Sequence, residues 1–130
     1  MITELLNRWA AVEPSRCRSY QGDLYRSVMF EVLLTIEQRA GWVAIGSFTD
    51  IESMTGLAVL QYAIQQAVVA RDFRLRLENL PVGWEAIVFA IDDRPSFSPY
   101  EQGTEPAIVM LKSYVSFLES QEAIEEQPKK

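Results

Sequence analysis

The sequence contains no histidine, and this absence excludes more chemistry than any other feature of its 130 residues. Without histidine there is no histidine-based catalytic triad, no histidine metal ligand and no side chain that ordinarily transfers protons near neutral pH. The chain also has no Gly-rich phosphate loop, Walker motif, dinucleotide fingerprint, GxSxG motif or zinc-ligand spacing. We therefore expect no catalytic residue, no metal site and no cofactor, and the sequence favours a protein that is not an enzyme.

Cysteine is almost absent as well, since Cys17 is the only one. A single cysteine allows no internal disulfide, so the fold does not depend on an oxidising compartment. The first residues lack a basic segment followed by an apolar run, which is the pattern of a signal peptide. The longest clearly apolar stretch, residues 86–91, is far too short to cross a bilayer. We expect a cytoplasmic protein that does not act at a membrane.

Basic residues are fewer than acidic ones, 12 against 18, and the formal net charge is −6. An acidic surface repels phosphate backbones, so nucleic acid is an unfavourable partner. The charge either keeps the protein dissolved or forms an acidic docking surface for a basic protein. The hydrophobic fraction of 48% is enough for an ordinary core. We expect one compact domain over residues 1–120, followed by a disordered acidic tail over residues 121–130.

Hydrophobic periodicity predicts an α+β fold with elements in the order α-β-β-α-β-β-α. We expect a single antiparallel sheet of about four strands with the helices packed on it. The segments 15–23 and 92–104 are rich in polar and turn-forming residues and are predicted as loops. The predicted helices cover 3–13, 55–71 and 104–120, and the predicted strands cover 24–38, 42–48, 73–79 and 84–92.

Residues 24–38 fit two interpretations. Unbroken alternation and β-branched content favour a strand, whereas the same stretch read as a helix has a broad apolar arc. In the strand interpretation, Gln38 to Gly41 form a hairpin turn in which Gly41 takes a positive φ. In the helix interpretation, Gly41 is a C-cap.

The two strands in the second half of the chain differ in pattern. Residues 73–79 alternate, which predicts that Phe73, Leu75 and Leu77 face inward while Arg74, Arg76 and Glu78 face outward. Residues 84–92 are apolar on both faces apart from Glu85, so we expect this strand in the middle of the sheet with cover on both sides. Helices can cover one side. The N-terminal helix, or a second copy in a homodimer, can cover the other.

Two pairs of residues are the candidate binding groups. Arg74 and Arg76 share one face of a strand about 7 Å apart and could hold a carboxylate or phosphate, with Arg71 nearby. The alternative is a solvated charged face. Phe97 and Tyr100 are aromatic residues in a predicted loop, where contact with a partner is a natural role.

Other reactive groups have simpler explanations. Cys17 lies between Arg16 and Arg18, and neighbouring cations favour a thiolate. No histidine base is available to support it, so we expect an incidental surface cysteine. Three carboxylates, Glu31, Glu37 and Glu85, could gather on one sheet face, but they more simply mark its solvent side.

The element order and the acidic charge are similar to those of the small dimeric chaperones of type III secretion. The run from WEAIVF to PAIVMLKSYVSFL is similar to that of small phage-encoded α-β-α sandwich proteins. Both are likenesses of architecture, and no site residue is transferred from either.

Three functions follow from these features. The leading hypothesis is a small acidic, non-enzymatic binding or adaptor protein that acts through protein–protein contacts. The second is a small-ligand-binding protein or minor enzyme that uses Arg74, Arg76 and surface carboxylates. The third is an acidic inhibitor that mimics nucleic acid.

Overall fold

The computed structural model describes residues 2–21, 28–45, 54–90 and 101–125. Within these ranges the chain is α+β, as predicted. The helices are α1 (Ile2–Val12), α2 (Met54–Ala70) and α3 (Pro106–Glu125). The strands are β1 (Cys17–Gln21), β2 (Val28–Ile36), β3 (Arg39–Ala44), β4 (Phe73–Leu80), β5 (Gly83–Ala90) and β6 (Glu101–Gly103).

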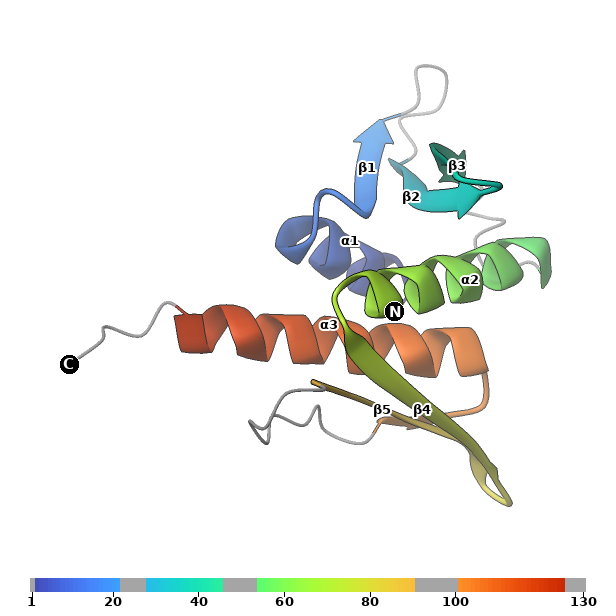
Figure 1. Cartoon of the computed structure of the whole chain (residues 1–130). Coiled ribbons are helices and arrows are strands. Elements are labelled where there is room, and N and C mark those ends of the chain that lie inside the picture. Colours follow the sequence, from blue (N-terminus) through green and yellow to red (C-terminus); the bar gives the residue numbers. More distant parts are fainter. Residues whose placement is uncertain (1, 22–27, 46–53, 91–100, 126–130) are drawn as a thin grey trace.

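The described strands form two separate antiparallel sheets, with the helices between them (Figure 1). The first sheet has the order β1-β2-β3 and packs on α1 and α2. The second has the order β4-β5-β6 and packs mainly on α3, while α2 contacts both sheets. Each sheet therefore packs one face on the described helices, the arrangement in which a sheet alternates apolar and polar residues.

The expectation of one sheet of about four strands is wrong, for two reasons. Local pattern gives strands and hairpins but does not say whether two hairpins pair with each other. In addition, β1 and β6 lie in segments predicted as loops. Among residues 17–20 of β1, whose burial is described, only Cys17 is fully buried, and the sequence CRSYQ is polar; β6 is three residues long. Neither is long and apolar enough to show a strand period.

Residues 28–36 form a strand, so the strand interpretation of this region is correct. The hairpin turn predicted over Gln38 to Gly41 is wrong. The turn lies at Glu37 and Gln38, which both have positive φ, of 51° and 68°. Two consecutive positive φ values match the twist of a tight hairpin. Gly41 instead pairs with Leu34 inside β3.

The central strand of the second sheet is β5, as predicted, with β4 on one side and β6 on the other. Ala86 and Val88 belong to the buried core on the side of α3. Ile87, on the opposite face, is also buried, at 6% exposure. The described helices lie on only one face of this sheet, and α1 packs on α3 and β1 instead of covering the other face of β5. Cover by a second copy, the other alternative, stays a prediction.

A continuous cluster of buried side chains joins the two halves through the helices. Ile2, Leu6 and Trp9 project from α1, and Met110 and Tyr114 project from α3. The last helix begins at Pro106, where the side chain of Glu105 accepts the Ala107 N–H at 3.3 Å.

Helix α3 extends to Glu125, into the segment expected to be a tail, while residues 126–130 lie outside the description. Among the described residues, the helices are too short or too polar to span a bilayer.

Candidate functional site

Strand β4 is an edge strand, and its free side is the most distinctive surface of the second half. It pairs with β5 along its whole length, from Phe73 opposite Ala90 to Leu80 opposite Gly83. No backbone hydrogen bond joins its other side to another described segment. An edge strand of eight residues presents unpaired N–H and C=O groups, which are a template for another chain.

A groove of about 680 Å³ follows this free edge between β4 and α2. We call it the β4 groove. Apolar side chains line much of it, including the buried Met110 and Val68 and the partly buried Leu75 and Leu77. Val69 stands at its wall with 73% of its surface exposed. The full lining is Gln65, Val68, Val69, Asp72, Phe73, Arg74, Leu75, Arg76, Leu77, Phe89 and Met110.

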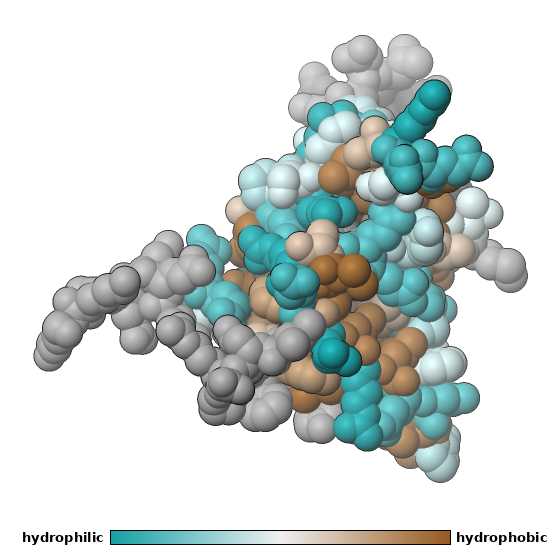
Figure 2. All heavy atoms as spheres, in the orientation of Figure 1, coloured by the Kyte–Doolittle hydropathy of each residue, from teal (hydrophilic) through white to brown (hydrophobic). Residues whose placement is uncertain are grey.

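Figure 2 shows the mixed character of this side, with apolar patches over α2 and along β4 set between polar side chains. Leu75 and Leu77 face the core, as the alternation predicts, yet they are only partly buried. Their remaining apolar surface is in contact with water. A chain bound along the edge strand would bury that surface and gain hydrophobic free energy.

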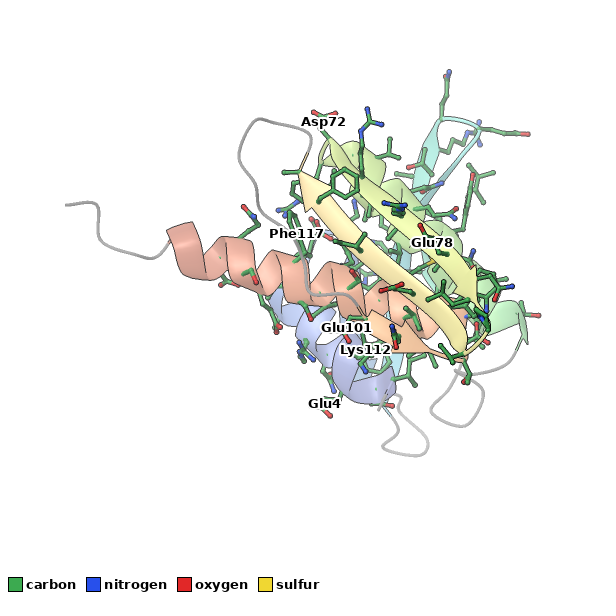
Figure 3. All side chains as sticks on the ribbon, turned by 90° about the horizontal axis from the view of Figure 1, so that it is seen from below. Glu4, Asp72, Glu78, Glu101, Lys112 and Phe117 are labelled. Carbon is green, nitrogen blue, oxygen red and sulfur yellow. The ribbon has the colours of Figure 1, made fainter. Side chains whose placement is uncertain are left out.

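The charged face of β4 lies on the other side of the strand. Arg74 and Arg76 are both exposed, as predicted, and both border the β4 groove. Arg76 Nε lies 2.7 Å from Glu78 Oε1, so these two charges pair along one strand. Glu78 projects from β4 in the view of Figure 3 and lies directly opposite Glu85 of β5. A second, smaller pocket of about 190 Å³ is lined by Arg76, Glu78, Glu85 and Ile87.

The structure separates other residues that the sequence grouped. Arg71 does not join Arg74 and Arg76, because its Nε lies 3.0 Å from the carboxylate of Glu13. Glu31 lies in the first sheet and Glu85 in the second, so the less favoured alternative, in which these carboxylates gather on one sheet face, is excluded. Phe97 and Tyr100 lie outside the described residues, and their contact role stays a prediction.

Sequence reasoning missed Glu13, a polar residue of the described part of the chain that is only 4% exposed and has several side-chain partners. Its carboxylate accepts hydrogen bonds from Trp9 Nε1 at 2.9 Å and from the Tyr114 hydroxyl at 2.8 Å, in addition to the Arg71 ion pair. The signal was the four-residue spacing of Trp9 and Glu13, which places both on one side of α1 and its end. This network ties α1, α2 and α3 together and is fully partnered, so it serves structure rather than chemistry.

Cys17 is not a surface residue, because it is fully buried in β1. Its Sγ donates to the Leu6 carbonyl at 3.7 Å. Burial, and secondarily the charge of Glu13, raise the pKa of the Cys17 thiol to about 12. The same causes raise the pKa of Tyr114. The expected effect of Arg16 and Arg18 on the thiol is therefore reversed, and a protonated buried thiol is unreactive.

The described ranges contain no group of three or more acidic or cysteine side chains arranged to hold a metal ion. Comparison of the chain with protein-family models, with curated proteins and with solved structures finds no match. Its function is therefore argued from the β4 groove and the charges beside it.

Proposed function

We propose that this protein is a non-enzymatic binding module that takes an extended polypeptide along the free edge of β4. The observation that carries the proposal is the coincidence of three features on one strand: an unpaired edge, the adjoining β4 groove and alternating charges. Backbone hydrogen bonds to the edge supply affinity, and the groove and charges select side chains. The cytoplasmic location expected from the lone cysteine remains part of this proposal.

A small-ligand site is the weaker alternative. The pocket beside Arg76 and Glu78, at about 190 Å³, lies below the roughly 300–1,000 Å³ of typical small-molecule sites. The β4 groove is large enough, but a wall residue as exposed as Val69 would leave a small ligand open to water. If the double variant Arg74→Ala, Arg76→Ala abolished a ligand-induced thermal shift in a metabolite panel, this alternative would replace the proposal.

A mimic of nucleic acid is less favoured on this surface. Such a mimic needs carboxylates gathered without cations between them. On the second sheet, Glu78 and Glu85 are interleaved with Arg74 and Arg76. The charge there is mixed and suits a polypeptide better than a nucleic-acid-binding partner.

The test is site-specific photo-crosslinking in cells. A photoreactive residue in place of Val69 lies at the β4 groove, and one in place of Ile36 is the control. Ile36 is also an exposed apolar residue, at 59%, but it lies in the first sheet. We expect a polypeptide adduct at position 69 and none at position 36.

The crosslinked segment is then identified by mass spectrometry, synthesised and added to the purified protein. We expect it to slow hydrogen exchange of β4 amides and to leave β3 amides unchanged. Equal adducts at both positions, or no protection of β4, would remove the proposal.

A further inference from the structure

We propose that the polypeptide on the β4 edge is a second copy of this chain, paired antiparallel through β4 about a two-fold axis. The inference rests on the proposed function, because it names the occupant of the same edge. Pairing of this kind joins two three-stranded sheets into one continuous sheet of six strands. It uses the same surface on both copies, which is the usual geometry of a homodimer.

The pleat of the strand limits the registers. Residues directly opposite each other point to the same face of a sheet, so outward arginines can meet only outward residues of the second copy. In one register Leu77 lies opposite Leu77 of the second copy. Arg76 then lies opposite Glu78 of the second copy, and Glu78 opposite Arg76.

The neighbouring registers each place like charges opposite one another across the two β4 strands. A shift toward the start of β4 places Arg74 opposite Arg76, twice. A shift toward its end places Glu78 opposite Glu78. An intermediate shift pairs Arg74 with Glu78 but sets Arg76 against Arg76. Because like charges directly opposite are destabilising, the Leu77-centred register is selected.

The dimer in this register also balances the negative charge around Glu78 better than the single molecule does. Glu78 already has Glu85 directly opposite it on β5, an unfavourable neighbour that Arg76 of its own strand offsets. In the dimer, Arg76 of the second copy approaches Glu78 from the free side. The four charges from two strands then alternate in sign around a square, and each like pair lies on the longer diagonal.

An independent observation supports the same register. Among the residues that the structure describes, Val69 and Val82 have the most exposed large hydrophobic side chains, at 73% and 80%. Val69 lines the β4 groove beside Asp72, and Val82 is at the tip of the β4–β5 hairpin. In the Leu77-centred register, the hairpin tip of one copy lies opposite Asp72 of the other. The dimer therefore brings each Val82 to the open end of the opposing groove, beside Val69.

Sedimentation velocity over a range of concentrations tests this arrangement with two charge reversals, Arg76→Glu and Glu78→Arg. Both side chains are exposed, at 65% and 44%, so folding should persist, and circular dichroism with urea unfolding checks it. We expect the wild-type chain to dimerise. Each reversal should raise the dissociation constant by roughly tenfold or more, because it creates two like-charge pairs. Arg8→Glu, at the surface pair with Glu119, is the control that leaves dimerisation unchanged.

Mixing the two variants is the decisive step. A chain with Glu at 76 and 78 meets a chain with Arg at 76 and 78, so every opposite pair becomes attractive. The equimolar mixture should form a heterodimer at concentrations where each variant alone is monomeric.

Failure to recover the heterodimer, or reversals without effect, would overturn the register and with it the inference. A wild-type chain that stays monomeric would overturn the second copy as occupant. In that case the proposed function is still supported if position 69 crosslinks to another polypeptide and that polypeptide slows hydrogen exchange of the β4 amides.

Discussion

The two sheets have the same strand order and the same antiparallel pairing, but their exposed backbone is completed in different ways. In the first sheet, β1 pairs with β2 only as far as Val32. Beyond that point the Leu33 N–H donates to the Arg16 carbonyl at 2.9 Å, and the side-chain amide of Gln66 bonds both the N–H and the C=O of Thr35. Nothing comparable completes β4 within the described residues. Helix α2 therefore completes the end of β2 in the first sheet but leaves the edge of β4 in the second sheet open.

The contrast is clearest in two adjacent residues of α2. Gln66 imitates a neighbouring strand for β2, with bonds of 2.8 and 2.9 Å. Gln65 lines the β4 groove instead. Strand β3 is also an edge, but its first three residues are all exposed, without the apolar–charged alternation of β4. Of these edges, only β4 combines length, an apolar groove and self-complementary charge.

The largest effect on stability is expected for Glu13→Ala, at the end of α1. It leaves the Tyr114 hydroxyl and the Trp9 N–H without their buried acceptor and removes the Arg71 ion pair. We expect a loss of about 2–6 kcal/mol in the free energy of unfolding, measured by urea titration, because two buried donors at roughly 1–3 kcal/mol each lose their acceptor. Arg8→Ala, which removes the exposed pair with Glu119, should cost less than about 1 kcal/mol. Similar losses for the two variants would contradict a structural role for the network.

The next effect concerns the hairpin that carries the open edge. Gly83 has a φ of 134°, and a Cβ there would lie 2.6 Å from the Gly103 carbonyl oxygen of β6. We expect Gly83→Ala to lower the free energy of unfolding by about 2–3 kcal/mol. Gly41→Ala meets open space in β3 and should be neutral or slightly stabilising. Thermal denaturation of both variants separates the two cases, and equal midpoints would refute the close approach.

A smaller effect sharpens the difference between neighbouring glutamines. Gln66→Ala removes two hydrogen bonds to Thr35, and we expect a loss of about 1 kcal/mol because water replaces part of the interaction at this exposed site. Gln65→Ala should leave the stability of the single molecule unchanged, since Gln65 lines a groove. Urea unfolding measures both. Hydrogen exchange at the Thr35 amide should quicken only in the Gln66 variant, and the reverse pattern would show that α2 does not complete β2.

The smallest effect at neutral pH is that of Cys17. Folding raises the pKa of its thiol from an ordinary value near 9.0 to about 12, so between these values the unfolded chain releases a proton that the folded chain retains. Stability is therefore unaffected below pH 9.0 and falls as the pH rises above it. Tyr114 acts in the same direction. Cys17→Ala should weaken this alkaline dependence. Rapid alkylation of Cys17 in the folded wild-type protein would contradict its burial.

The second half of the fold was the more predictable one. Apolar and charged residues alternate along β4 because one face of the strand packs on helices and the other faces water. This alternation can be recognised in the sequence alone. The apolar run of β5 reflects its central position. The candidate groups Arg74 and Arg76 lie on the outer face for the same local reason.

What the sequence could not provide is the partner of each element. Whether two hairpins join into one sheet depends on how the helices pack between them, and no local pattern contains that information. The short strands β1 and β6 exist because longer neighbours pair with them. The burial of Cys17 and Glu13 likewise depends on helices distant in the chain, which is why the polar flank of Cys17 suggested a surface position for it.

The turn between α2 and β4 sets how the open edge can respond to an occupant. Only Arg71 and Asp72 separate the two elements, Asp72 has a φ of 57°, and Arg71 is tied to the buried Glu13. The two walls of the β4 groove are thus fastened to each other at one end before anything binds. Such a preorganised site spends little free energy on ordering itself. Association should therefore proceed close to rigid-body docking, with selectivity arising from width and charge rather than from induced fit.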